Sequence, residues 1–239
     1  SHRNLVAAEI EPVRRRVRET LARLAGEFPG TPLVVLSALA EGGDQLVAQE
    51  ALAAGARVIA PLPLPPDLYL DDFADAAARE TFEALCRRAD LVPLPMLAGN
   101  SRDSVGPRGA ARDRQYAQAG IYIASHCHLL LAIWDGRDSD RLGGTAQIVD
   151  YFLTGMPPGG IERRRERRPR LYGGGDERLL CHMVCSRDMP DGKPVAPLQP
   201  GQIVWRNLDQ ASEPDAPMPQ AFRTVFAHTD AFNLDAARY

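Results

Sequence analysis

The sequence predicts an α/β fold of three layers, in which helices cover both faces of a mostly parallel β-sheet. Three observations lead to this prediction. Short aliphatic runs of the kind that form buried parallel strands begin at Leu33, Arg57 and His128. Segments with apolar residues at helical spacing lie between and after these runs. In two places a pair of glycines stands between such a strand and the helix that follows it.

The first βαβ unit covers residues 33–61, LVVLSALAEGGDQLVAQEALAAGARVIAP. The expected strand 33–36 leads into a small-residue turn, and a helix begins at Asp44 and ends at Gly55, a natural C-cap. A right-handed crossover to the strand 57–60 places the turn at the carboxyl end of the sheet. Backbone N–H groups and a helix N-terminus favour an anionic ligand there. This turn alone is equally compatible with a tight turn chosen for packing.

The segment 61–72, PLPLPPDLYLDD, contains too many prolines for a helix or a central strand. We expect a rigid loop that overhangs the carboxyl end of the sheet. Tyr69 and Phe73 either pin this loop to the core or contact a ligand. The other elements expected in this half are an amphipathic helix at 11–24, a helix at 73–89, a strand at 91–94 near an edge, and a mobile polar loop at 97–109.

A second strand–glycine–helix turn follows a helix at 112–125. The strand 128–134 is almost wholly apolar and is therefore expected to be central, and the loop DGRDSDRLGGT leads to a helix at 146–153. Gly143 and Gly144 allow a ligand to approach the backbone, and Thr145 offers an N-cap hydroxyl. Two such turns at one sheet edge, with Ser37 and Gly144 on the same side, predict a crevice for a phosphate-bearing ligand.

The last third has a looser pattern. The basic run at 162–170, ERRRERRPR, could touch RNA or DNA, but it lacks interleaved aromatic residues, and a solvated loop is the preferred interpretation. We expect strands at 179–186 and 202–205, the latter at an edge, and a final helix at 217–232. The whole chain, 1–239, is expected to form one domain with its core in about 1–156, which residues 157–239 complete.

Composition excludes several classes of function. A net charge of −3 and a pI near 6.0 provide no field that attracts nucleic acid. The four cysteines form no Cys-x-x-Cys pair, and His126 and His128 have no carboxylate or cysteine at metal spacing, so reduced core thiols in a cytoplasmic protein and no metal site are expected. No apolar run is long enough to cross a bilayer, so no direct membrane contact is expected. No nucleophile motif is present, and neither catalytic residues nor a cofactor are predicted.

The segments LSALAEGGDQLVAQEALAAGARVIAPLP, LLLAIWDG and GGTAQIV resemble the SLOG superfamily over most of residues 33–156. These Rossmann-like domains are related to Lonely Guy phosphoribohydrolases, DNA-processing A proteins and the ADP-ribose-binding domain of melastatin-type channels. The resemblance implies that the two turns hold nucleotide phosphate and ribose, and His2-Arg3 looks like the end of a Gly-His-Arg turn after a first strand. The ligand-binding residues it implies are His2, Arg3, Ser37, Glu41, Gly42, Gly43, Asp44, Trp134, Asp135, Gly143, Gly144, Thr145 and Gln147. Possible lid residues are Tyr69, Asp72, Arg112 and Arg114.

The chain departs from the Lonely Guy signature at its catalytic glutamate. The corresponding position is Ile148, and the neighbouring Gln147 cannot ionise, so an amide there could bind ribose but could not act as a general base. The resemblance therefore favours a homodimeric sensor that binds a nucleotide or a nucleotide-derived second messenger and regulates an effector or transmembrane module attached C-terminally in bacterial antiphage defence. Two alternatives remain: a nucleoside 5′-monophosphate phosphoribohydrolase, and a module that binds single-stranded nucleic acid.

Overall fold

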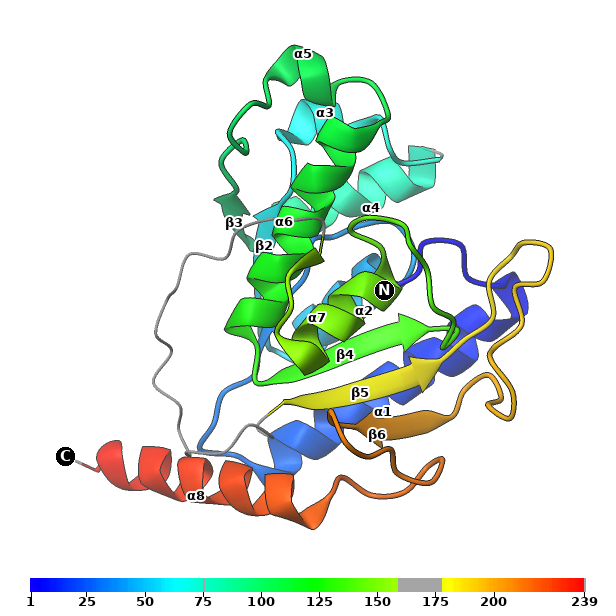
Figure 1. The fold of residues 1–239 in the computed structure, drawn as a ribbon. Coiled ribbons are helices and arrows are strands. Elements are labelled where there is room, and N and C mark those ends of the chain that lie inside the picture. The colour runs from blue at the N-terminus through cyan, green and yellow to red at the C-terminus, as the bar shows by residue number, and fades with distance from the viewer. Residues whose placement is uncertain (75, 159–177, 239) are drawn as a thin grey trace.

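A computed structural model describes residues 1–74, 76–158 and 178–238, and it confirms the predicted α/β fold (Figure 1). Strands and helices alternate along the first two thirds of the described chain. The strands form two three-stranded sheets rather than one continuous sheet. The basic run at 162–170, for which a solvated loop was expected, lies outside the described residues.

The first sheet contains β1 (Val34–Leu36), β2 (Arg57–Leu62) and β3 (Asp90–Pro93), all parallel and in that order. Helix α2 (Gly43–Ala53) connects β1 to β2, and α4 (Ala76–Cys86) precedes β3. The edge position predicted for the third strand is confirmed. Proline is tolerated at the end of an edge strand because no further strand needs its backbone N–H.

The second sheet contains β4 (Leu129–Trp134), β5 (Leu179–Val184) and β6 (Ile203–Arg206). β4 and β5 are parallel, and β6 is antiparallel to β5 and forms the predicted edge. The expectation that residues 128–134 form a central strand is wrong for this sheet, because β4 pairs with β5 on one side only. Its apolar character comes instead from helices that cover both of its faces.

The two faces of β4 and β5 pack against different helices. Side chains of even-numbered β4 residues, such as Ala132, pack with Val149 and Phe152 of α7 (Thr145–Thr154). Ile133 on the opposite face belongs to the core that includes Val17 of α1 (Ile10–Glu27). Figure 1 shows the same arrangement, with α7 and α6 (Ala110–His126) on one side of β4 and β5 and α1 on the other. The second sheet is therefore the middle of three layers.

Two short helices appear in segments predicted to be loops. The prediction that 61–72 contains neither a helix nor a central strand is wrong, because Pro61 and Leu62 end β2, the middle strand of the first sheet, and α3 spans Pro66–Leu70. Pro66 lies in the first turn, where the N–H that proline lacks has no intrahelical acceptor in any case. In the polar loop at 97–109, α5 (Arg102–Val105) begins with a capping box between Ser101 and Ser104.

The remaining elements are a 3₁₀ turn, η1 (Ala7–Glu9), and the long helix α8 (Gln220–Ala236), which lies below the second sheet in Figure 1. One hydrophobic cluster includes residues of both sheets, among them Ala60 of β2 and Met183 of β5, together with α1. Within the described residues, no helix combines the length and the hydropathy needed to span a membrane.

Candidate functional site

The first residues of the chain join the carboxyl end of β4 to the start of α2. The backbone N–H of His2 donates to the carbonyl oxygen of Ile133 at 3.0 Å, and the N–H of Gly43 donates to the carbonyl oxygen of His2 at 2.9 Å. Ser37, after β1, and Gly143, before α7, line one cavity together with Ser1. The two strand–glycine–helix turns therefore face the same crevice, as predicted.

The glycine pair of the first turn makes room for the chain itself. Gly42 has a φ of +81°, and a Cβ atom on it would collide with the backbone carbonyl of Arg3. A Cβ atom on Gly43 would lie 2.6 Å from the Cβ atom of Ser1. The packing interpretation of this turn is the one these distances support, because the space beside both glycines is filled by residues 1–3.

Three further residues of the first turn are engaged in internal hydrogen bonds. Ser37 Oγ donates to the carbonyl oxygen of Asp44 at 3.2 Å and accepts from the N–H of Leu39, which has a positive φ of 58°. Glu41 Oε2 accepts from the N–H of Ala74 at 3.0 Å, and Asp44 Oδ1 accepts from the amino group of Ser1 at 3.1 Å. These contacts hold the turn in shape.

His2 and Asp135 form a buried polar pair. The Nε2 atom of His2 lies 3.1 Å from Oδ1 of Asp135, and their side chains are 11% and 3% exposed. Burial lowers the pKa of His2 from 6.5 to about 4, although the nearby carboxylate of Asp135 opposes that shift. At neutral pH the imidazole is therefore uncharged. Asp135 also accepts from the N–H of Arg137, and Trp134 Nε1 donates to the carbonyl oxygen of Arg137 at 3.1 Å, so both side chains are committed to the loop after β4.

The proposed lid residues do not form one movable group. Tyr69 is fully buried and donates from its hydroxyl to the carbonyl oxygen of Ala38 at 3.1 Å, so it pins the loop to the core. Arg112 is buried, lies 2.9 Å from Asp72 Oδ2 and donates to the carbonyl oxygens of Leu68, Val105 and Gly106. Arg114 is exposed and bonds Asn100.

The second turn leaves a helix N-terminus with unused donors. Gln147 Oε1 accepts from the N–H of Gly143 at 3.1 Å, and its Nε2 donates to the carbonyl oxygen of Asp140 at 3.2 Å. The N-cap residue of α7 is Gly144, which has no side chain to cap the helix. Consequently, the N–H groups of Thr145, Ala146 and Gln147 have no acceptor in the part of the chain that the structure describes.

The two glycines of this turn have different surroundings. Gly143 has a φ of +74°, and a Cβ atom on it would lie 2.7 Å from the backbone nitrogen of Ala117 in α6. A Cβ atom on Gly144 would lie 3.0 Å from the carbonyl oxygen of Arg141. Bulk at Gly144 would therefore press on its own loop, whereas Gly143 permits close packing of the turn against α6.

Arg3 and Tyr116 provide the remaining polar groups at this end of the cavity. The guanidinium of Arg3 lies over the Tyr116 ring, 5.4 Å from its centroid, and donates from Nη1 to the backbone carbonyl oxygen of Asp72 at 3.4 Å. No carboxylate of a described residue is within ion-pair distance of it. The buried hydroxyl of Tyr116 has no hydrogen-bond partner among those residues. Both residues line the cavity that Gly143 and Thr145 also line. Tyr116 lies in the helix predicted at 112–125, and nothing in its spacing shows where the hydroxyl lies.

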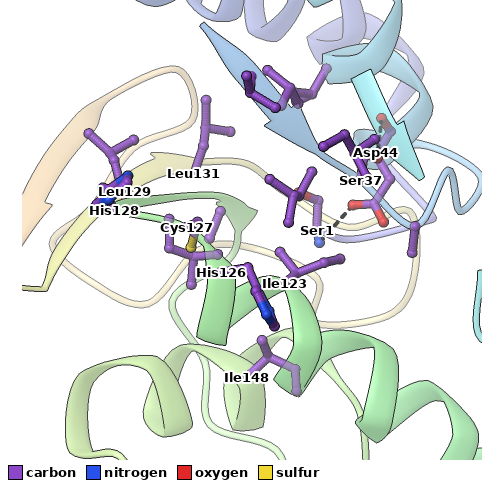
Figure 2. A pocket seen from close by; sticks show the side chains of 18 of the residues that line it. Ser1, Ser37, Asp44, Ile123, His126, Cys127, His128, Leu129, Leu131 and Ile148 are labelled. Atoms are coloured by element: carbon purple, nitrogen blue, oxygen red, sulfur yellow. Dashed lines mark hydrogen bonds and ion pairs between the residues drawn. The ribbon is translucent and has the colours of Figure 1, made fainter. Parts of the chain in front are cut away.

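The cavity has a volume of about 1030 Å³ and extends from this polar end along an apolar slot between β1 and β4. Figure 2 shows the region where the two parts meet, with Ser1 between Ser37 and Asp44 on one side and Ile123 on the other. Leu129 and Leu131 line the slot beyond it. The arrangement combines a small cationic and hydrogen-bonding end with a long apolar interior.

Neither a metal centre nor an activated nucleophile is apparent in the described residues. They contain no cluster of three or more His, Cys, Asp or Glu side chains suited to a metal ion. The cysteines are free thiols, and burial raises the pKa of Cys181 and Cys185 to about 12, which keeps both protonated. No family model, curated protein or solved structure matches this chain.

Proposed function

We propose that this protein binds a phosphate-bearing, nucleotide-derived small molecule where the first turn of α7 meets Arg3. One observation carries the proposal: a cation without a carboxylate partner and a helix N-terminus with free N–H groups line the same end of one cavity. Helix N-termini and arginine are the groups that most often hold phosphate in proteins. Among the residues implied by the resemblance, Arg3 and Thr145 are therefore the ones we assign to the ligand.

The rest of the ligand would lie against Tyr116. An aromatic ring beside an arginine offers a stacking surface for a base, and a buried hydroxyl without a partner is a donor and acceptor for ribose or base. Gln147 is a weaker candidate than the sequence suggested, because both ends of its amide already bond the loop before α7. The resemblance to SLOG domains supports the same class of ligand.

Binding is favoured over hydrolysis. At the position of the Lonely Guy glutamate, Ile148 packs with the α7 core, and its Cδ1 atom would lie 2.4 Å from a Cβ atom on Gly120. A carboxylate would not be tolerated there without a partner. Phosphoribohydrolase activity is the second candidate, on the resemblance alone, and release of free base from nucleoside monophosphates would establish it.

The biological setting follows from the resemblance. We place the protein in the cytoplasm as a homodimeric sensor that controls an attached effector or transmembrane module in antiphage defence. Four free thiols, of which those of Cys181 and Cys185 are buried, are compatible with a reducing compartment. Binding of single-stranded nucleic acid is the least favoured alternative, because the net charge is −3.

The experiment that tests the proposal is a ligand screen followed by calorimetry. The purified chain is heated with nucleoside monophosphates, ADP-ribose and cyclic di- and oligonucleotides, and a ligand at about 100 times its Kd should stabilise it by roughly 2.7 kcal/mol. Arg3→Ala should weaken binding of the best ligand by about 10- to 100-fold, as expected for a charge-assisted hydrogen bond. Arg238→Ala, at the exposed end of α8, is the matched loss of one charge and should leave the affinity unchanged.

Three results would reject the proposal. The first is a screen in which no nucleotide stabilises the chain. The second is an Arg3→Ala variant that binds as tightly as the parent. The third is binding to oligonucleotides alone with a steep dependence on salt, which would favour the nucleic-acid alternative.

A further inference from the structure

The apolar slot lies between two open strand edges. In the described residues β1 pairs only with β2, and β4 pairs only with β5. Residues 32–36 line one side of the cavity and residues 128–132 line the other, so the slot follows both strands along their length. Val34 belongs to β1, whose second edge has no strand neighbour, and it is 45% exposed. Two strand edges, each from a parallel strand pair, therefore face each other across one cavity.

The backbone groups on both edges are aimed into this slot. The carbonyl oxygen of Leu33 accepts from Arg57, and the N–H of Ser37 donates to Ile59, so odd-numbered residues of this strand bond β2. The N–H and C=O groups of Val34 and Leu36 point the opposite way, into the slot.

The same alternation holds in β4. The carbonyl oxygen of Trp134 accepts from the N–H of Cys185 on the β5 side, so the odd-numbered Leu129, Leu131 and Ile133 direct their backbone groups into the slot. Unpaired N–H and C=O groups along a strand edge form a template for pairing with a further strand. A small apolar ligand would fill the space but leave these groups unpaired.

The walls of the slot are apolar on both faces. Leu21 and Leu24 of α1 lie on one face, Ile123 and Ile148 on the other, and Phe222 and Phe226 of α8 line it as well. A strand covered by helices on both faces is apolar at every position rather than at alternate positions. At about 3.3 Å per residue, a strand of six residues spans about 20 Å, the length of the six-residue β4 beside it.

The first two residues already pair with β4 as the end of such a strand would. The N–H of His2 donates to the carbonyl oxygen of Ile133 at 3.0 Å, and the N–H of Ile133 donates to Ser1 Oγ at 3.4 Å. The side chain of Ser1 is 5% exposed, and the residue lines the cavity. The end of a separate peptide in the slot would collide with Ser1. A segment joined to Ser1 would avoid this collision, because Ser1 would be its next residue.

We propose that the slot is the seat of a β-strand of about five or six apolar residues that runs parallel to β1 and β4 and is joined to the amino group of Ser1. Its backbone would bond Val34 and Leu36 on one side and Leu129 and Leu131 on the other. The two sheets then become one continuous, mostly parallel sheet. This inference is independent of the ligand proposed above.

Amide hydrogen exchange tests the proposal residue by residue. The chain 1–239 is compared with the same chain extended before Ser1 by Val-Ile-Val-Val-Ile-Thr, and with a control extension, Val-Pro-Val-Pro-Ile-Thr, which should not form a strand between two others because proline is not tolerated in a central strand. In the first extension the amides of Leu36 and Leu131 should exchange on the order of 100-fold more slowly. The amides of Val35 and Leu130, which face β2 and β5, serve as internal references and should change far less.

A more soluble extension, Val-Thr-Val-Thr-Ile-Thr, retains β-branched residues and allows the same measurement if the first extension aggregates. The proposal is overturned if Leu36 and Leu131 exchange equally fast with and without the extension, or if the proline control protects them equally. It is also overturned if Val-Ile-Val-Val-Ile-Thr added as a separate peptide protects these amides and the joined extension does not.

Discussion

The Nε2 atom of His2 lies 3.1 Å from Oδ1 of Asp135, and this contact ties the segment before α2 to the residue that follows β4. The backbone bonds from His2 to Ile133 and from Gly43 to His2 reinforce the connection. The carboxyl ends of the two sheets thus meet at one histidine.

Acidification should destabilise the protein through His2. The folded-state pKa is about 4 and the unfolded value is 6.5, so between these values the unfolded state binds the proton more readily. The free energy of unfolding should therefore be highest above pH 6.5 and fall as the pH decreases to about 4. At about 1.4 kcal/mol per pKa unit, the loss from this group reaches about 3 kcal/mol. Denaturant unfolding at a series of pH values measures it.

The matched variants for this experiment are His2→Gln and His128→Gln. The first should flatten the pH dependence, whereas the second replaces an exposed histidine and should retain the slope of the parent. Burial also lowers the pKa of His182, so part of the acid destabilisation will remain in His2→Gln. Equal slopes for His2→Gln and the parent would contradict the prediction.

A substitution at Gly42 should destabilise the fold more than its backbone angle alone predicts. An alanine at a positive φ costs about 1–3 kcal/mol, and at Gly42 the new Cβ atom would also displace the carbonyl of Arg3. Gly99 has a similar φ of +83° with nothing within 4 Å of a Cβ atom. Gly42→Ala should therefore lower the free energy of unfolding by more than Gly99→Ala, as measured by urea titration. Equal losses would mean that Arg3 moves away at no cost.

Replacement of Arg112 should be among the most damaging changes away from the apolar core. Arg112→Leu leaves the Asp72 carboxylate buried without its cation and removes donors from three carbonyl groups, so a loss of about 3–5 kcal/mol is expected. Arg102 forms an exposed pair with Asp67, and Arg102→Ala should cost no more than about 1 kcal/mol. Thermal unfolding of both variants provides the comparison. A loss at Arg112 as small as that at Arg102 would show that water reaches the pair.

Removal of the Tyr116 hydroxyl should weaken ligand binding without lowering the stability of the protein. In the absence of ligand, Tyr116→Phe removes a buried hydroxyl that has no partner in the described chain, so stability should stay within about 1 kcal/mol of the parent or rise. If the hydroxyl bonds the ligand, affinity should fall by about 3- to 10-fold, the value of one neutral hydrogen bond. Calorimetry with the ligand found by screening measures the second effect. Unchanged affinity would remove the hydroxyl from the site.

Most of the fold was predictable because the spacing of apolar residues along the chain indicates which side of each helix or strand is buried. The helix predicted at 11–24 is observed at Ile10–Glu27, and the strand predicted at 128–134 is observed as β4. Helix α3 was missed because a proline count shows where a helix cannot continue but not where one can start. The open edge of β4 was missed because an apolar strand has the same composition whether its neighbour is a strand or a cavity.

The sequence predicted which turns lie at the site but not which of their residues face a ligand. The sequence shows two glycine pairs before two helices, and the structure brings both turns to one cavity. Which glycine faces a ligand depends on φ and on distant chain: Gly42 contacts Arg3, while Gly144 contacts its own loop. The importance of Arg3 rests on the absence of a carboxylate near it in the described residues, and local sequence does not reveal that kind of relationship.

The bond between Ser1 and Ile133 spans 132 positions of the chain. At a synthesis rate of about 5–20 residues per second, Ser1 and His2 wait roughly 7–26 s on the ribosome before their partners in β4 have been made. The contacts of β1 with β2 form from nearby residues in the meantime. During translation the first sheet can therefore assemble alone with one apolar edge uncovered, which makes this interval the one in which a ribosome-bound chaperone would protect the nascent chain.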